Sequence, residues 1–448
     1  MNYLLFLSIF FGLSIFYFIL GYIASKKMEK TSDYFLAGRK LGLVPVTFTL
    51  IATQLGGGML LGTSQEAYSI GLYGIMYTVG MSLGFLILGL GFASRLQSFG
   101  VSTTAELFET KYKSPNLKKI ASLLSVVAMF GLLIGQIIGS RFLIEGLGIH
   151  NEFVFIAFWA IVITYTIMGG LKAVAITDTV QVIFVIVIFS SIFIFSLLNE
   201  PISFFSFLQL TKNQYFFSSA NISYKSLIGI ALMPALFSLI EQDLAQRFFA
   251  SRTKKIAAVS AILASIFLLL FSLVPIYFGM KAKLMGIEFS GSPLIPVISL
   301  LTNEFVLILV VCAIIAAITS TGDSLLCAIS SNVSQDFNFS FLGIKNKLRL
   351  SKTITFFIGV LAVIGSYFVP KNIISIMIGS YEISVCCLLI PLLFSYFKEK
   401  LNKNAAIGSI IFGLAGFILF RIYPIPFPRE IASLVLSMIG YLMGNKCK

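Results

Sequence analysis

The chain has 448 residues, of which 58% are hydrophobic and only 11% are charged. This leaves too little polar surface to cover a soluble globule of this size, so the composition excludes a soluble protein and indicates a membrane protein. The net charge of +14 does not indicate a nucleic-acid partner, because the basic residues are dispersed rather than gathered in one patch.

Apolar runs long enough to cross a bilayer recur along almost the whole chain. About 20 apolar residues span the hydrocarbon core as a helix. The sequence predicts an all-α polytopic membrane protein with about thirteen transmembrane helices. They cover residues 3–24, 43–64, 70–94, 118–144, 151–169, 174–198, 223–246, 254–280, 304–337, 349–369, 371–397, 404–423 and 427–444. The first run lacks the short apolar core and cleavage site of a secretory signal, so we expect it to be retained.

The distribution of Lys and Arg predicts an orientation. If thirteen spans follow an outer N-terminus, most of the 32 basic residues fall in inner loops, as the positive-inside rule requires. We therefore expect the N-terminus outside and the C-terminus in the cytoplasm, with the chain in a bacterial inner membrane.

Two predicted spans contain residues that break helices. Three consecutive glycines, Gly56, Gly57 and Gly58, lie in the span 43–64, and Pro234 lies in the span 223–246. Backbone groups freed inside a bilayer must bind other protein groups or line a cavity. The two interruptions are five spans apart, where two inverted five-helix repeats would each place their first helix. The alternative is that these residues merely allow close packing or a kink.

Four short motifs follow one another along the chain in a defined order and spacing. They are SDYFLAGR at Ser32–Arg39, IATQLGGG at Ile51–Gly58, GGLKAVAITDTVQ at Gly169–Gln181 and AAITSTGDS at Ala316–Ser324. Their order and spacing agree with those of one known family across about residues 1–400. The chain therefore resembles the sodium:solute symporter family, which includes sodium-coupled carriers of proline, pantothenate and sugars.

The resemblance implies a fold of the leucine-transporter type with two inverted repeats of five helices. The chain would then consist of a first helix and inner loop at 1–42, repeats at 43–198 and 199–397, and two C-terminal helices at 398–448. The implied function is sodium-coupled symport of a small polar organic solute by alternating access. An amino acid, pantothenate or another carboxylate fits better than a sugar, because Gly58 and Met59 stand where the family's sugar carriers have polar residues.

A sodium site requires hard oxygen ligands, which an unwound helix and Ser or Thr hydroxyls can supply. By the resemblance, the principal site consists of three carbonyl groups and two hydroxyl groups, from Ala52, Leu55, Ala317, Ser320 and Thr321. Without the resemblance, these hydroxyls would be expected to bond to a carbonyl one turn earlier or to another helix.

Two acidic residues lie inside predicted spans, where a carboxylate is costly and therefore indicates a functional site. Some members of the family bind a second sodium, and here Asp178, Ser320, Asp323 and Ser324 would line that site or the ion's inward path. The family often has a small hydroxyl residue where Asp323 stands. The alternative is that both carboxylates are hydrated at the inner membrane interface.

The resemblance places the solute near the midplane, beside the two broken helices and the eleventh predicted span. The candidate solute-binding residues are Gln54, Gly58, Met59, Ser238, Tyr381 and Glu382. Glu382 would suit a substrate ammonium group or a proton relay, and its alternative partner is a hydroxyl of a neighbouring helix. Glu241, Asp243 and Arg247 are expected to form a solvated, partly paired helix end outside the solute site.

The sequence favours few other functions. With one histidine, and with cysteines confined to predicted spans and the C-terminus, no cofactor and no metal beyond sodium is expected. An enzyme would need paired catalytic groups, and a channel would need a pore filter or rings of charge. We expect a solute, sodium and the bilayer as partners, and no nucleic acid. A proton-coupled carrier of the same fold, a channel and a sensor remain the alternatives, and the oligomeric state is not predicted.

Overall fold

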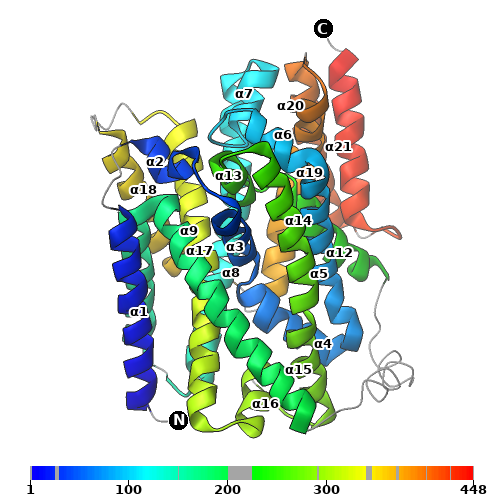
Figure 1. The fold of residues 1–448 in the computed structure, drawn as a ribbon. Helices are drawn as coiled ribbons and strands as arrows, with labels where there is room; N and C mark the ends of the chain where they lie inside the picture. The colour runs from blue at the N-terminus through cyan, green and yellow to red at the C-terminus, as the bar shows by residue number, and fades with distance from the viewer. Residues whose placement is uncertain are drawn as a thin grey trace.

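The computed structural model describes residues 3–25, 30–149, 151–199, 224–289, 292–339, 346–369, 373–399, 401–423 and 425–446. These residues are almost entirely helical, as the composition predicts (Figure 1). Among them, β pairing is limited to one bridge between Leu41 and Ser251. Helices satisfy their backbone hydrogen bonds internally, which is what a bilayer requires of a spanning segment.

The helical elements follow one another with short connections. In chain order they are α1 (Tyr3–Ser25), α2 (Thr31–Leu36), η1 (Ala37–Arg39), α3 (Leu43–Gln54), η2 (Gly58–Gly62), α4 (Thr63–Ile70), η3 (Gly71–Ile75), α5 (Met76–Ile87), η4 (Leu88–Phe92), α6 (Ala93–Ser98), α7 (Glu106–Tyr112), α8 (Pro115–Gly146), α9 (Glu152–Asn199), α12 (Tyr224–Ser238), α13 (Gln242–Ala250), α14 (Lys254–Phe271), α15 (Leu273–Leu284), α16 (Leu294–Leu301), α17 (Glu304–Asp336), α18 (Lys347–Gly365), α19 (Ile373–Phe397), α20 (Lys403–Ile422) and α21 (Arg429–Lys446).

Ten helical segments in the described ranges are long and apolar enough to cross a membrane. The predicted span 43–64 is split between α3 and the segment that begins at η2. The predicted spans 151–169 and 174–198 form one 48-residue helix, α9, and α21 falls outside the ten. The count of thirteen crossings therefore stays a prediction.

A sharp bend divides α9 into two halves that run in opposite directions (Figure 1). At the bend, Gly170 has φ 50° and ψ −159°. A Cβ at this position would lie 2.4 Å from the carbonyl oxygen of Tyr34. Since only glycine tolerates both the backbone angles and this close approach, the Gly169-Gly170 motif creates the turn.

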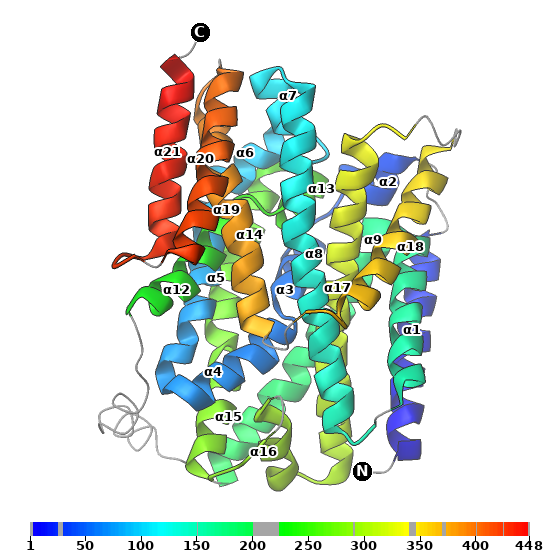
Figure 2. The same ribbon diagram turned by 180° about the vertical axis from the view of Figure 1, so that it is seen from behind.

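The two ends of the chain lie at opposite ends of the helical bundle. α1 starts at one end and α21 finishes at the other in both views (Figures 1 and 2). The short helices α7 and α16, which precede the long helices α8 and α17, also lie at opposite ends. This inversion is what two repeats of opposite orientation would produce. The repeat boundaries at 43–198 and 199–397 stay predictions, because residues 200–223 are outside the described part.

The core of the bundle is built around α17, which packs against α8, α9 and α18. Almost every residue from Val310 to Asn332 is buried. At the edge of the bundle, α1 exposes Ile15, Ile19 and Ile23. Apolar side chains exposed around the periphery are expected where a helix contacts lipid.

Both predicted helix interruptions exist, but one lies at a different place. The first interruption is at Leu55 and Gly56, between α3 and η2. The second is at residues 239–241, between α12 and α13, so its predicted position at Pro234 is wrong. Pro234 lies inside α12, because the helix tolerates the loss of one backbone hydrogen-bond donor there. The helix continues to Ser238, and Glu241 then has an extended backbone with φ −62° and ψ 123°.

Candidate functional site

A small group of buried oxygen atoms joins the interrupted helix α3 to α17. The Thr321 hydroxyl donates to the Ala52 carbonyl at 2.9 Å and lies 3.2 Å from the carbonyl oxygen of Ala317. The Ser320 hydroxyl donates to the same Ala317 carbonyl at 2.9 Å. All four residues are at most 4% exposed. The structure thus brings together four of the five residues that the motifs assign to sodium.

Glycine at the break allows this contact. A Cβ at Gly56 would lie 2.5 Å from Thr321 Oγ1 and 2.7 Å from Gln136 Oε1 of α8. The Gln136 side chain also accepts a hydrogen bond from the Gly57 N–H at 2.8 Å. Leu55, the fifth predicted ligand, is fully buried at the break itself. Three helices therefore meet where α3 is interrupted.

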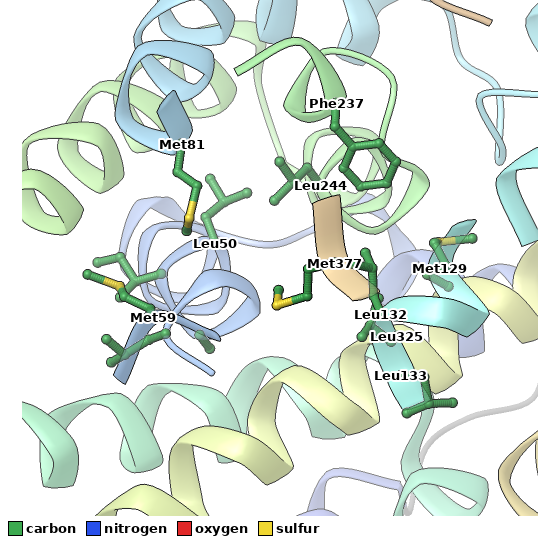
Figure 3. Close-up of a cluster of buried hydrophobic side chains, with 14 of the residues drawn as sticks. Leu50, Met59, Met81, Met129, Leu132, Leu133, Phe237, Leu244, Leu325 and Met377 are labelled. Atoms are coloured by element: carbon green, nitrogen blue, oxygen red, sulfur yellow. The ribbon is translucent and has the colours of Figure 1, made fainter. Parts of the chain in front are cut away.

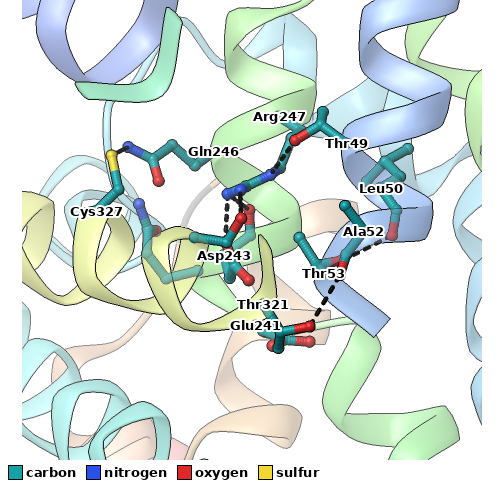
Figure 4. A network of polar contacts seen from close by, with 12 residues as sticks. Thr49, Leu50, Ala52, Thr53, Glu241, Asp243, Gln246, Arg247, Thr321 and Cys327 are labelled. Atoms are coloured by element: carbon teal, nitrogen blue, oxygen red, sulfur yellow. Dashed lines mark hydrogen bonds and ion pairs between the residues drawn. The ribbon is translucent and has the colours of Figure 1, made fainter. Parts of the chain in front are cut away.

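A second buried polar cluster lies beside the first, between α3, α9, α13 and α17. Arg247 forms an ion pair with Asp243 and donates through Nη2 to the Ser324 hydroxyl. Its Nε donates to the Thr49 hydroxyl at 3.4 Å, and this hydroxyl in turn donates to Asp178. Figure 4 shows Arg247 between Thr49 and Asp243. One guanidinium group therefore links three helices through charged and hydroxyl groups.

Asp178 and Asp323 complete this cluster. The Tyr165 hydroxyl donates to Asp323 Oδ2 at 2.7 Å. Both carboxylates are 0% exposed, so neither side chain lies on the surface at a membrane interface. Within the described ranges, the Oδ1 atom of each carboxylate has no hydrogen-bond partner. Buried acceptor oxygens without a donor are available to a cation.

The helix end at Glu241, Asp243 and Arg247, which we expected to be solvated, is buried. Glu241 is 5% exposed, and the other two are fully buried. The α13 helix packs against α2, α3, α6 and α17 rather than lying at a membrane surface. A short polar helix after an apolar span has the composition of an interface, so hydropathy alone could not show that it is enclosed. The i, i+4 spacing of Asp243 and Arg247 was the available signal for a pair.

A narrow cavity adjoins the first oxygen cluster. Its polar lining comes from Thr53, Gln54, Gln136, Glu241, Thr321 and Tyr381, and its apolar lining includes Leu132, Leu325 and Met377. Figure 3 shows the apolar side, with Met377 near Leu132 and Leu325. The volume is about 10 Å³, roughly the space for one water. A solute therefore requires side chains or helices to move.

Two hydrogen bonds hold polar side chains of the cavity lining in place. Gln54 Nε2 donates to Glu241 Oε2 at 3.4 Å. The hydroxyls of Tyr381 and Tyr77 form a hydrogen bond of 3.0 Å. Met377 packs directly over Gly58, because a Cβ there would lie 2.5 Å from the methionine sulfur. A flexible thioether side chain thus fills the space next to a carboxylate, an amide and a phenol.

Three of the six residues predicted to bind solute line this cavity. These are Gln54, Gly58 and Tyr381. Met59 is fully buried outside the lining, and the Ser238 hydroxyl donates to the carbonyl of Pro234 at 2.8 Å. Glu382 accepts a hydrogen bond from Arg421 at 2.8 Å and pairs with Arg429 at 3.3 Å, so its partners are guanidinium groups beyond α19.

Sequence reasoning missed the other lining residues, which are Thr53, Leu132, Gln136, Glu241, Leu325 and Met377. Gln136 interrupts an apolar span, which was a usable signal for an internal polar contact. The sequence could not identify Met377, because a methionine in an apolar helix is expected to be an ordinary core residue.

Comparison with known proteins tests the family resemblance over most of the chain. Residues 34–413 match the sequence model of the sodium:solute symporter family. The chain belongs to the sodium:solute symporter family. This symporter is a transporter rather than an enzyme, and sodium is its coupling ion.

Two relatives illustrate the range of the family. The sodium/pantothenate symporter of Escherichia coli (strain K12) is 24% identical over 471 residues, which cover 98% of this chain and 95% of that protein. The osmoregulated proline transporter OpuE of Bacillus subtilis (strain 168) is 29% identical over 171 residues, or 36% of this chain and 35% of that protein.

Solved structures confirm the fold of this symporter. A Na⁺-coupled sialic acid symporter in a substrate-bound outward-open state has a TM-score of 0.80 at 19% identity, covering 99% of this chain and 96% of that one. Mhp1, a nucleobase-cation-symport-1 family transporter in a closed conformation, has a TM-score of 0.62 at 11% identity, covering 92% of this chain and 94% of that one. The leucine-transporter type of fold implied by the motifs is thereby confirmed.

Proposed function

We propose that this symporter carries a small organic solute with a positively charged or hydrogen-bond-donating group, such as the ammonium group of an amino acid. The buried carboxylate of Glu241 in the cavity is the observation that carries the proposal. Its one hydrogen bond in the described part of the chain comes from the neutral Gln54 amide, at the long distance of 3.4 Å. A buried carboxylate is stabilised by a cation, and a solute ammonium would supply one.

The amides of Gln54 and Gln136 can donate to an acidic group at the other end of such a solute. Pantothenate, which is a carboxylate, is the second candidate, because the similarity to the sodium/pantothenate symporter extends over 98% of this chain. A sugar fits less well, since Gly58 and Met377 present no hydroxyl-binding group on their side of the cavity.

Sodium would bind at the break in α3. The proposed ligands are the carbonyl oxygens of Ala52, Leu55 and Ala317 and the hydroxyl oxygens of Ser320 and Thr321. Hydroxyl hydrogens rotate freely, so the two oxygens could turn their lone pairs to an ion between the carbonyls. Thr321 also lines the solute cavity. Sodium binding would therefore fix the wall of the cavity, which is how the two binding events would be coupled.

A second cation site or ion path would lie among Asp178, Asp323, Ser320 and Ser324. Two acceptor atoms without donors, Asp178 Oδ1 and Asp323 Oδ1, support this proposal. Arg247 is the cation that contacts this cluster, while three aspartates, including Asp243, belong to it. The local charge therefore favours a further cation.

Replacing Asp178 by Asn is expected to slow sodium-driven uptake, because Asn has nearly the same shape and lacks the charge. Initial uptake rates against sodium concentration, in proteoliposomes with matched protein content, measure the effect. Asp178→Glu keeps the charge and serves as the control. Asn variants that transport as well as the unmutated protein at every sodium concentration would remove Asp178 from the ion path.

Replacing Glu241 by Gln is expected to raise the solute concentration for half-maximal uptake by about tenfold, because the proposed ammonium partner is lost. The sodium dependence should change much less. Glu399→Gln, at an exposed carboxylate, is the matched control. An unchanged solute dependence in the Glu241 variant would argue against a solute cation at this position.

The distribution of basic residues supports a proposed orientation of the bundle. The end with α2, α7 and the C-terminal turn of α21 (Figure 1) carries the segments rich in Lys and Arg, so we place this end in the cytoplasm and the start of α1 outside.

Uptake assays in proteoliposomes test the function. Labelled amino acids, pantothenate, other carboxylates and sugars are offered under an imposed sodium gradient, and in parallel under a proton gradient. We expect accumulation of an amine-bearing solute, or of pantothenate, only with inward sodium. Accumulation of a sugar, or uptake driven by protons alone, would contradict the proposal.

A further inference from the structure

A basic pocket lies beside the end of α1 and shares no lining residue with the solute cavity. Its lining includes Lys30, Arg39, Lys40 and Lys172, together with Ser32 and Asp33. The pocket has a volume of about 690 Å³. This is within the range of small-molecule sites, roughly 300–1,000 Å³.

The described lining of the pocket carries four basic residues and one acidic residue. Asp33 is the one acidic residue of the lining, and its Oδ2 accepts a hydrogen bond from the Lys30 backbone N–H at 3.2 Å. The Arg39 guanidinium donates to the neutral carbonyls of Gly100 at 2.7 Å and Val101 at 3.0 Å. Across the described ranges, none of the four cations forms an ion pair. The pocket therefore attracts an anion.

The backbone of the pocket is held in an uncommon conformation. Ala37, Gly38 and Arg39 have φ values of 46°, 63° and 56°. Non-glycine residues rarely adopt positive φ, and such strain persists where the surrounding structure requires it, often at binding sites. Here the turn brings Arg39 and Lys40 to the same pocket as Lys172 of α9.

Exposed apolar surface on α1 lies near Lys172 of the pocket. On the last turn of α1, Tyr22 is 48% exposed and Ile23 is 58% exposed. The last turn of α1 packs against α9 here, since a Cβ at Gly21 would lie 3.9 Å from the side chain of Ala173, which follows Lys172 in the chain. A tyrosine and an isoleucine on the outside of a spanning helix are typical of contact with the membrane interface and with acyl chains.

We propose that this pocket binds the phosphate headgroup of an anionic phospholipid, with the acyl chains lying along α1. Lysine and arginine clusters beside a spanning helix bind such headgroups through charge, with each cation adding to the affinity. Free phosphate has the same charged group but no acyl chain to contact α1. The closeness of the exposed end of α1 to Lys172 in the basic pocket therefore favours a lipid as the occupant.

Native mass spectrometry of the full-length protein, titrated with phosphatidylglycerol in detergent, tests this inference. The double variant K40Q/K172Q is expected to bind phosphatidylglycerol about tenfold more weakly, since two headgroup contacts are lost. The variant K119Q/K403Q removes the same charge at two exposed positions and is the matched control, with an expected change below about twofold. The single variant Lys40→Gln changes only an exposed side chain, so we expect it to fold normally. If the double variant is unstable, weaker phosphatidylglycerol binding by this single variant tests the same proposal.

Two competitors separate the possible occupants. Inorganic phosphate is expected not to displace phosphatidylglycerol, and phosphatidylcholine is expected to bind more weakly than phosphatidylglycerol. Displacement by inorganic phosphate at equal concentration would identify a soluble-anion site and overturn the proposal. Equal losses in both double variants, or equal binding of phosphatidylcholine, would overturn it as well.

Discussion

Replacing Thr321 by Ala is expected to raise the sodium concentration for half-maximal uptake by about tenfold or more. The Thr321 hydroxyl bridges α3 and α17 through the carbonyl oxygens of Ala52 and Ala317, and it also lines the solute cavity. Alanine removes this oxygen from the proposed sodium site and removes the contact across the break in α3. Uptake rates in proteoliposomes at a series of sodium concentrations measure the change.

A matched control separates a sodium effect from a packing effect. Thr166 is a buried threonine whose hydroxyl donates to the carbonyl of Val162 at 2.8 Å, one turn earlier on α9. Thr166→Ala should therefore leave the sodium dependence nearly unchanged. Ser320→Ala should behave like the Thr321 variant, with a smaller shift because its hydroxyl contacts only the Ala317 carbonyl among the described groups. Identical sodium curves for Thr321→Ala and Thr166→Ala would remove Thr321 from the sodium site.

Replacing Arg247 by Gln is expected to destabilise the folded protein by about 3–5 kcal/mol. Arg247 is fully buried, pairs with Asp243 and donates to Ser324 and Thr49. Without the guanidinium group, three buried aspartates would lose the nearby positive charge. A buried carboxylate that has lost its partner is destabilising, because it has given up its hydration without gaining an ion pair. Thermal unfolding of the purified protein in detergent, followed by fluorescence, measures the loss.

The double variant Asp243→Asn with Arg247→Gln removes both partners of the ion pair, so it should regain part of the lost stability. Arg252→Gln changes an exposed arginine five residues along the chain and should have little effect. A melting temperature of Arg247→Gln equal to that of Arg252→Gln would contradict the structural role assigned to the buried arginine.

The fold was largely predictable, because the thickness of the bilayer sets the length of an apolar helix that spans it. Residues that interrupt such a helix also stand out in the sequence. The apolar runs predicted the long helices, and the three glycines predicted the first interruption. The position of the second interruption was not predictable from Pro234, since a proline removes only one donor and α12 continues beyond it. Likewise, two predicted spans merge into α9, because helical geometry persists on both sides of Gly170.

The candidate site was predictable only where a motif identified it. The contact of Thr321 with Ala52 follows the family pattern, and it joins residues that are distant in the chain. By contrast, Glu241 was expected in a solvated helix end, because one-dimensional hydropathy does not show which polar segments other helices enclose. Glu382 was expected to face the solute, but its arginine partners on α20 and α21 can be recognised only in three dimensions.

Sodium-dependent stability of the purified protein is the most direct test of the sodium site, because it requires no knowledge of the solute. Sodium chloride is exchanged for choline chloride at constant ionic strength, and the melting temperature is recorded for the unmutated protein and for Thr321→Ala. A ligand at about 100 times its dissociation constant stabilises the folded state by about 2.7 kcal/mol, so we predict a saturable rise in melting temperature with sodium, strongly reduced in the variant. Equal melting temperatures in sodium and choline, or the same rise in both proteins, would contradict sodium binding between α3 and α17.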